Sequence, residues 1–213
     1  MVLDMKFSRS ESGLVDLVGL NKTLGSSKVI IDFNLSIKAG EVMCLLGTNG
    51  SGKTTLVNLI TGLIPLDPED GGDVSIYIAD EDRRVSLRSS LTEFRSYVRL
   101  CQQDDFLFDE LTAREHLELV CRLRGIDKKD QVAQVIADKA KEVDVETEIH
   151  KKVKFISPGA KRKLSIAMAL IGDAKFIILD EPTSNLDLKS REKIWFLIKK
   201  IAQQKERCIL IST

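Results

Sequence analysis

The sequence predicts an α/β fold with a mainly parallel core sheet, a β-rich N-terminal region and an inserted α-helical segment. Three observations predict it. Short apolar strand patterns alternate with helical patterns, a four-residue apolar run fills 176–179, and helical periodicity dominates the stretch after Thr112. A continuous apolar run is typical of a central parallel strand that is covered on both faces. The 213 residues suffice for one large domain or two small ones.

The first half of the chain carries most of the strand patterns. Runs rich in Val, Ile and Leu predict these elements in order: strands at 14–20 and 29–37, a buried strand at 42–46, a helix at 54–61 and a strand at 74–78. Residues 80–95 are charged and rich in serine, with weak periodicity. We therefore expect them to form a surface connection to a short strand at 97–101.

The second half is mainly helical. Thr112 and Glu115 form a capping-box pattern at the start of a helix that ends at Gly125. Apolar spacing then predicts these elements: a helix at 128–142, a helix that starts near Ala160, a final helix at 188–204 and a closing strand at 208–211.

Charge and hydropathy exclude several classes of protein. Lys plus Arg and Asp plus Glu both number 32, and aromatic residues make up 5%, so neither a basic stripe nor a stacking platform for nucleic acid is expected. No apolar run approaches the ~18 residues of a membrane span. The N-terminus also lacks a secretory signal pattern, so we expect the chain by itself to be soluble and to face the cytosol.

The cysteines and histidines show no metal-binding spacing. Four cysteines are scattered without a CxxC pair, and we expect reduced thiols. His116 and His150 are both interpreted as surface residues. The basic run 161–163 is interpreted as a solvated helix face.

The segment Gly47–Thr54 matches the pattern GxxxxGK[ST] between a predicted strand and a predicted helix. Glycines let the backbone wrap around a phosphate, and the helix N-terminus adds its positive dipole end. The alternative is a glycine-rich turn without a ligand. Lys53 is expected to reach the β- and γ-phosphates and Thr54 to ligate Mg²⁺. The residues predicted to bind ATP here are Gly47, Thr48, Asn49, Gly50, Ser51, Gly52, Lys53, Thr54 and Thr55.

Two acids, Asp180 and Glu181, directly follow the apolar run. They are expected at the carboxyl end of a parallel strand, where α/β sheets bind ligands. Asp180 is predicted to hold Mg²⁺ through water, and Glu181 to orient or deprotonate the attacking water. The alternative is that this pair only caps a helix.

The segment 180–187, DEPTSNLD, resembles the extended Walker B motif and D-loop of the nucleotide-binding domain of ABC transporters. Residues 101–112 with 114–117, and 161–165 with 167–172, are similar to the eukaryotic A subfamily of lipid transporters. The resemblance covers nearly the whole chain. It implies a P-loop NTPase fold of the ABC ATPase type, with an N-terminal antiparallel β region and a helical subdomain at 104–160 within a nucleotide-binding domain spanning 1–213.

The resemblance also implies roles for residues outside the phosphate loop. Gln103 is the expected Q-loop glutamine, which contacts Mg²⁺ and the attacking water; the adjacent Gln102 leaves the register open, and a plain surface glutamine is the alternative. Ser157 and Gly159 belong to the signature loop and would contact the γ-phosphate of a partner domain's ATP. Asp187 of the D-loop is also expected at the nucleotide.

Three departures from the family pattern are visible. Pro158 and Ala160 alter the signature, which predicts a weak or degenerate site opposite it. Leu24 stands where the family usually has an aromatic residue that stacks on adenine. The chain ends at Thr213, where the switch-loop histidine would come next. We expect a fragment of a longer protein rather than a complete domain that has lost the histidine.

The resemblance implies an ATP-hydrolysing, Mg²⁺-dependent motor domain of an A-type transporter, at the cytosolic face of a membrane. It would pair head to tail with a second nucleotide-binding domain and drive transmembrane domains, with lipid as the expected substrate. No nucleic-acid partner is expected. Two alternatives stay open: an ATP-binding regulatory module with slow hydrolysis, and a soluble ABC ATPase not linked to transport.

Overall fold

The computed structural model describes residues 13–172, 174–203 and 207–213. The chain divides into two compact units. The first comprises the described parts of 1–100, 175–180 and 202–213, and the second those of 101–174 and 181–201. The predicted helical subdomain at 104–160 lies wholly within the second unit.

The first unit contains an antiparallel sheet with the strand order β2-β1-β4-β5. Its strands are β1 (Val15–Leu24), β2 (Ser27–Ile37), β4 (Asp73–Ile78) and β5 (Arg83–Ser86). Val15 of the central strand β1 lies opposite Ile37 on one side and Ile76 on the other, and all three are fully buried. The expected N-terminal antiparallel region is confirmed.

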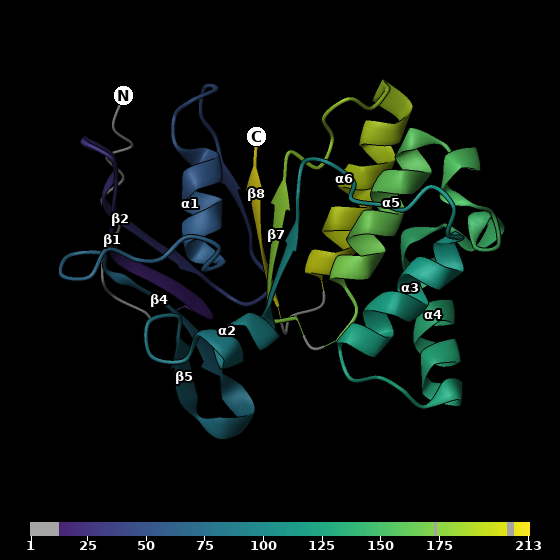
Figure 1. The fold of residues 1–213 in the computed structure, drawn as a ribbon, viewed down its shortest axis with the longest axis horizontal. Helices are drawn as coiled ribbons and strands as arrows, with labels where there is room; N and C mark the ends of the chain where they lie inside the picture. Colours follow the sequence, from purple (N-terminus) through teal and green to yellow (C-terminus); the bar gives the residue numbers. More distant parts are fainter. Residues whose placement is uncertain (1–12, 173, 204–206) are drawn as a thin grey trace. The chain divides into compact units, whose positions relative to one another are not determined.

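A second sheet in the same unit has the strand order β3-β8-β7-β6. Its strands are β3 (Val42–Leu45), β6 (Val98–Cys101), β7 (Phe176–Asp180) and β8 (Cys208–Ser212). β8 pairs in parallel with both β3 and β7, and the apolar run of β7 is buried. The predicted parallel core is therefore confirmed, with the last strand in sequence placed between two earlier ones (Figure 1).

Two helices belong to the first unit: α1 (Lys53–Ile60), which packs against β7, and α2 (Leu91–Tyr97). The expectation that 80–95 is only a surface connection is wrong, because this stretch contains β5, most of α2 and the end of the 3₁₀ turn η1 (Ala79–Glu81). Phe94 is fully buried. Elements this short show little periodicity of their own, and tertiary pairing with β4 stabilises β5.

The expectation of a buried strand at 42–46 is only partly met. Cys44 is exposed, and Leu46, beyond the end of β3, is 63% exposed, whereas Leu45 is buried. β3 is one of the two edge strands of its sheet among the described residues. An apolar sequence run alone cannot distinguish an edge strand from a central one.

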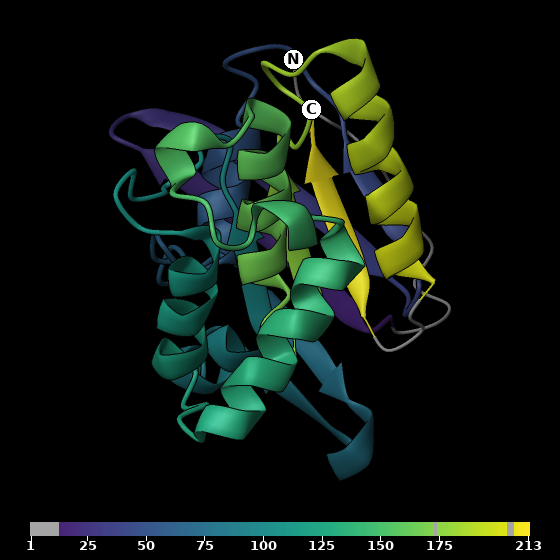
Figure 2. The same cartoon turned by 90° about the vertical axis from the view of Figure 1, so that its right-hand side faces the viewer.

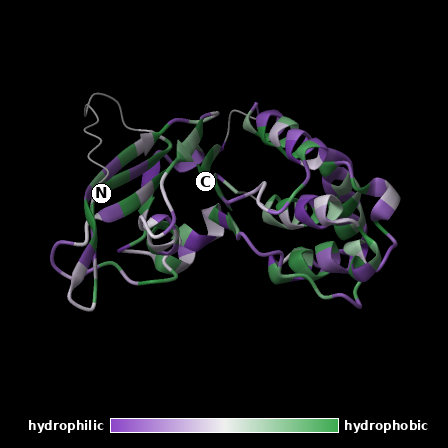
Figure 3. Ribbon diagram, turned by 90° about the horizontal axis from the view of Figure 1, so that it is seen from above, coloured by the Kyte–Doolittle hydropathy of each residue, from purple (hydrophilic) through white to green (hydrophobic). Residues whose placement is uncertain are grey.

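The second unit is helical. Its elements are α3 (Ala113–Leu123), α4 (Lys129–Val143), α5 (Pro158–Ala169) and α6 (Leu188–Ala202), with the short 3₁₀ turns η2 (Glu146–Glu148) and η3 (Val153–Phe155). The helices α3, α4 and α5 pack against one another (Figure 2). Hydrophilic and hydrophobic residues alternate along them (Figure 3), as expected for helices with one buried face. No described helix has the length and hydropathy needed to cross a bilayer.

The capping box at the start of α3 is confirmed. Thr112 Oγ1 accepts from the backbone N–H of Glu115 at 3.2 Å, and Glu115 Oε2 accepts from the N–H of Thr112 at 2.7 Å. The expected end of α6 at Gln204 lies outside the described residues.

The interpretation of His116 as a surface residue is wrong, whereas His150 is exposed as expected. His116 is 1% exposed, its Nε2 accepts from the N–H of Phe108 at 2.8 Å, and its Nδ1 lies 2.9 Å from Thr112 O. Because one ring nitrogen accepts and the other faces a carbonyl, this arrangement requires a neutral imidazole protonated on Nδ1. The ring also stacks on Phe108.

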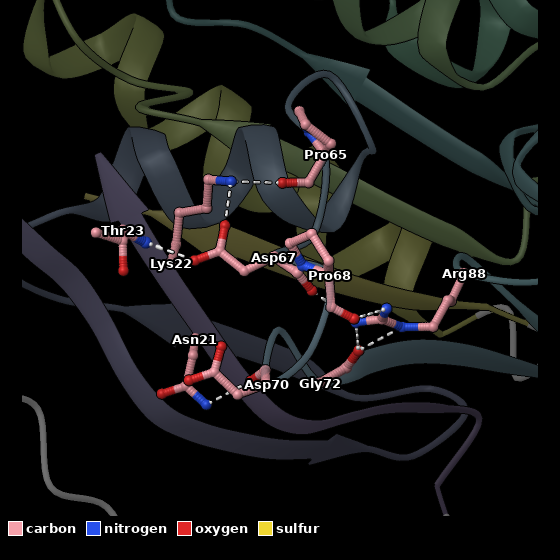
Figure 4. A network of polar contacts seen from close by, with 9 residues as sticks. All are labelled: Asn21, Lys22, Thr23, Pro65, Asp67, Pro68, Asp70, Gly72 and Arg88. Carbon is pink, nitrogen blue, oxygen red and sulfur yellow. Dashed lines mark hydrogen bonds and ion pairs between the residues drawn. The ribbon is translucent and has the colours of Figure 1, made fainter. Parts of the chain in front are cut away.

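A polar network fixes the loop 65–72 to β1 (Figure 4). Lys22, 8% exposed, donates to Pro65 O at 2.7 Å and to Asp67 Oδ1 at 2.5 Å. Asp67 Oδ2 accepts from the N–H of Thr23 at 2.9 Å. The hydrogen bond from Lys22, followed by that from the Thr23 backbone, lowers the pKa of Asp67 below its usual 3.8.

We predict that Asp67→Asn lowers the free energy of unfolding at pH 7 by about 1.5–3 kcal/mol, the range for hydrogen bonds to a charged partner. Because the pKa of Asp67 is lower in the folded state than its usual 3.8, the ionised carboxylate stabilises the fold fully above pH 3.8. This stabilisation is lost as the pH falls through the folded-state pKa. The difference between variant and wild type should therefore shrink toward pH 3. Urea unfolding at both pH values measures it.

The matched control is Asp70→Asn, because Asp70 is exposed and takes part in this network through its backbone carbonyl, which accepts from Asn21 at 2.8 Å. It should unfold like the wild type. Equal stability of Asp67→Asn and wild type at pH 7 would contradict the assigned role of Asp67.

Candidate nucleotide site

The phosphate-loop segment forms the strand–loop–helix arrangement that its pattern requires. β3 ends at Leu45, and α1 begins at Lys53 with Gly52 as its N-cap. Gly50 and Gly52 have φ angles of 78° and 96°, in the left-handed region that favours glycine. The carboxyl ends of β7 and β8 point to the same edge of the sheet as this loop (Figure 1).

Lys53 lies across the loop with 9% of its surface exposed. Its Nζ donates to Gly47 O at 2.6 Å and to Thr48 O at 3.2 Å. Both acceptors are neutral carbonyls, so these contacts orient the ammonium without neutralising its charge. A positive charge held in this way beside a helix N-terminus favours an anionic ligand.

The loop is closely packed around Ser51. A Cβ on Gly47 would lie 2.5 Å from Ser51 Oγ, so any larger residue there would have to displace this hydroxyl. Ser51 Oγ is itself buried without a hydrogen-bond partner in the described part of the chain. An unpaired buried hydroxyl costs about 1–3 kcal/mol. The loop therefore fits a ligand rich in oxygen atoms.

A cavity of about 290 Å³ adjoins the loop. It is lined by Val29, Ile31 and Phe33 of β2 on one side and by Gly50–Lys53 on the other. This combination of apolar side chains and a cationic loop suits a molecule with an apolar body and an anionic end. Leu24, at the end of β1, is 47% exposed and does not line the cavity.

Asp180 lies at the carboxyl end of β7, in the same unit as the loop, and is half-buried. Ser212 of β8 is fully buried and donates its hydroxyl hydrogen bond to Asp180 Oδ1. Sequence reasoning missed Ser212. Its signal was the first of two hydroxyl residues that follow the apolar run 208–211, which only the strand order places beside Asp180.

The donors offered by the first unit fit Mg²⁺. Thr54 is exposed in the first turn of α1, so the unit offers a hydroxyl and the Asp180 carboxylate. Among the described residues, no group of three or more His, Cys, Asp and Glu side chains could hold a metal ion. Mg²⁺ is usually bound by one or two protein oxygens together with phosphate oxygens and water, which suits this sparse set.

Glu181 is the first residue of the second chain segment in the second unit, and its φ of 41° is rare for a residue other than glycine. Its carbonyl accepts from the N–H of Ser184 at 3.1 Å, which closes a turn. Backbone strain of about 1–3 kcal/mol persists only where the surroundings hold it, and it concentrates at functional sites. The turn fixes the direction in which the Glu181 side chain leaves the backbone.

Gln102 and Gln103 both have exposed side chains. Their backbone carbonyls accept hydrogen bonds from Arg162 of α5 at 2.5 and 3.3 Å. The interpretation of the run 161–163 as a solvated face is therefore wrong for Arg162 and Lys163, which are 3% and 8% exposed. Buried cations of this kind are held by partners far away in sequence, which a charge pattern does not reveal.

The signature loop is part of a helix start. Ser157 is the N-cap of α5, and its Oγ accepts from the N–H of Ala160 at 3.2 Å. α5 thus begins at Pro158, two residues before the predicted start near Ala160. Proline suits the first helical position because its missing N–H would have no partner there.

Close packing joins the signature loop to the start of α6. A Cβ on Gly159 would lie 2.8 Å from Ser190 Oγ. Ser190 donates through its hydroxyl and its backbone N–H to Asp187, at 2.6 and 3.0 Å, and these two bonds lower the pKa of Asp187. Asp187 therefore acts as a helix cap for α6 in this structure.

The predicted site residues fall into two groups. The phosphate loop with Thr55 and Asp180 belongs to the first unit. The second unit holds the other predicted residues, namely Gln103, Ser157, Gly159, Glu181 and Asp187.

The ABC transporter family matches residues 30–184. The chain belongs to the ABC transporter family. This ABC transporter domain is 37% identical over 185 residues to a human protein named phospholipid-transporting ATPase ABCA3, and 36% identical over 200 residues to the mouse glucosylceramide transporter ABCA12. The alignments cover 85% and 93% of the chain but only 10% and 7% of those relatives. The expected likeness to the A subfamily is confirmed.

A solved structure supports the fold. The chain resembles cbiO1 from Clostridium perfringens, part of the ABC transporter complex cbiONQ, with a TM-score of 0.81 and 24% identity. The match covers 95% of this chain and 79% of that one. The predicted ABC ATPase fold class is therefore confirmed.

We predict that Gly159→Ala destabilises the domain by about 1–3 kcal/mol, the usual cost of overpacking, because the new methyl group displaces the Ser190 hydroxyl. The cost should be smaller in a Ser190→Ala background, where only the contact to the Ser190 Cβ at 3.2 Å remains. Chemical unfolding of the four members of this double-mutant cycle measures the coupling. Purely additive effects would refute the contact.

Proposed function

We propose that the chain is the ATP-binding and ATP-hydrolysing motor domain of a lipid transporter of the A subfamily. The carrying observation is the phosphate loop, in which positive-φ glycines and a buried Lys53, whose ammonium donates to two neutral carbonyls, lie at the start of α1. The alternative of a glycine-rich turn without a ligand explains neither the buried lysine nor the unpaired Ser51 hydroxyl.

In this proposal the residues Gly47–Thr55 bind the phosphates of ATP. Lys53 exchanges its hydrogen bonds with the Gly47 and Thr48 carbonyls for contacts with the β- and γ-phosphates. The new contacts are stronger, because both the donor and the acceptor are charged. Thr54 and Asp180 would hold Mg²⁺, which neutralises phosphate charge when bound. Ser212 keeps the Asp180 carboxylate in place.

Hydrolysis is an attack of water on the γ-phosphorus. The new bond joins the water oxygen to phosphorus, the bond from phosphorus to the bridging oxygen of ADP breaks, and ADP and inorganic phosphate leave. Glu181 accepts the proton of the attacking water or orients it, while the Gln103 side chain contacts the same water. The fixed turn at Glu181 favours this role because it limits the directions open to the carboxylate.

The proposed partners follow from family membership. A second nucleotide-binding domain would pair head to tail, so that Ser157, Gly159 and Asp187 contact its ATP. Transmembrane domains would transmit the motion to the substrate, with this domain at the cytosolic face of the membrane. The names of the relatives, a phospholipid-transporting ATPase and a glucosylceramide transporter, support lipid as the substrate class.

A regulatory module with slow hydrolysis is the second candidate. Ala160 in place of the signature glutamine and the exposed Leu24 outside the cavity favour it. Pro158 weighs less, because the structure accommodates it as the first residue of α5. A soluble ABC ATPase is a weaker third candidate, since the relatives are transporters.

We predict that Lys53→Ala weakens ATP binding at least tenfold in the presence of Mg²⁺, because the main charge-assisted contact to the phosphates is lost. Isothermal titration of the purified chain measures it. Lys38→Ala, which removes an exposed cation of the same unit, should bind like the wild type. Unchanged affinity of a folded Lys53→Ala variant would refute the proposed site.

We predict that Glu181→Gln retains ATP affinity but lowers phosphate release by at least about 100-fold, the usual contribution of a general base. Steady-state phosphate release from the complete protein in lipid vesicles measures it, with Glu146→Gln, an exposed glutamate of the same unit, as control. A wild-type rate no higher than that of Glu181→Gln favours the regulatory module instead.

A further inference from the structure

The first turns of α5 carry two adjacent buried cations, Arg162 and Lys163, with different partners. The Arg162 Nε donates to Pro182 O at 3.0 Å. Its Nη1 donates to the carbonyls of Gln102 and Gln103 and pairs with Asp105 Oδ1 at 3.1 Å. One guanidinium therefore contacts two chain segments that are far apart in sequence, both within the second unit.

These two segments are the ones proposed to hold the attacking water. One contact is to the carbonyl of Gln103 itself, and another is to the carbonyl of the residue directly after Glu181. The guanidinium is planar and rigid, so donors at its Nε and Nη1 fix both backbones relative to one plane. A buried guanidinium also resists loss of its partners, because unpaired buried charge is costly.

The backbone strain at Glu181 requires such a restraint. Its φ of 41° is unfavourable for a glutamate, and the hydrogen bond from Arg162 to Pro182 O holds the peptide between Pro182 and Thr183, next to Glu181 in the turn. We propose that Arg162 is a positioning residue that sets the relative placement of the Gln103 backbone and the Glu181 turn for hydrolysis. This inference rests on the proposed ATPase function.

Lys163 provides a matched control. It lies on the same helix with similar burial, but its Nζ pairs with Asp144 Oδ2 at 2.7 Å and donates to Asp144 O at 3.1 Å. Removal of Arg162 leaves the carbonyl of Pro182 without this buried hydrogen bond, whereas Asp144, the partner of Lys163, is exposed and can bind water instead. Lys163→Met therefore controls for the loss of a buried cation from α5. The hydrogen bonds to the Q-loop and Glu181 segments come from Arg162, whereas those of Lys163 go to Asp144.

The first experiment is amide hydrogen exchange of the 213-residue chain as wild type, Arg162→Met, Arg162→Lys and Lys163→Met. Exchange in peptides covering 102–105 and 181–184 should accelerate at least tenfold in Arg162→Met and stay near wild type in Lys163→Met. Arg162→Lys should be intermediate, because one ammonium cannot reproduce the planar fork. It also serves as the readout if Arg162→Met does not fold.

The second experiment is ATP turnover of the complete protein in lipid vesicles. Arg162→Met should lower kcat at least tenfold with KM and ATP affinity within about twofold of wild type, and Arg162→Lys should recover part of kcat. Lys163→Met should retain kcat. This split between kcat and KM separates positioning from a general loss of structure.

Equal effects of Arg162→Met and Lys163→Met on exchange and on kcat would overturn the inference, as would wild-type exchange and turnover in a folded Arg162→Met. Absence of ATP binding and turnover in the wild-type protein would overturn the proposed function instead. The exchange comparison would then still decide whether Arg162 holds the two segments.

Discussion

The parallel pairing of β8 with both β3 and β7 is the constraint on which the first unit depends. It places the end of β3, and with it the phosphate loop, at the same sheet edge as Asp180. The pairing also brings Ser212 to the Asp180 carboxylate and joins the N–H of Thr213 to Leu45 O. β8 is thus the strand that connects the loop-bearing β3 to the acid-bearing β7.

The second unit relies on buried or capped polar groups rather than on sheet pairing. Ser157 caps α5, Thr112 caps α3 and Asp187 caps α6, so three helix starts are fixed by side-chain oxygens. Arg162 supplies contacts of longer range by joining the Q-loop to the turn after Glu181. The residues with proposed functions are thus also the residues that end or connect structural elements.

This overlap affects how departures from the family pattern are interpreted. Pro158 fits the first position of α5, so its missing N–H does not disturb the helix start. Gly159 lies close to Ser190, so a larger residue there would displace the Ser190 hydroxyl, independently of any ligand. Asp187 likewise has a structural role in capping α6. Loss of function in variants at these positions therefore has to be compared with loss of stability.

The sequence by itself determined the fold class, the phosphate loop and the capping box of α3, because each rests on local spacing that backbone geometry requires. It missed β5, α2 and the burial of His116, Arg162 and Lys163. Only the tertiary structure decided these, and only it placed Ser212 beside Asp180, because partners distant in sequence, together with the strand order, set burial and pairing.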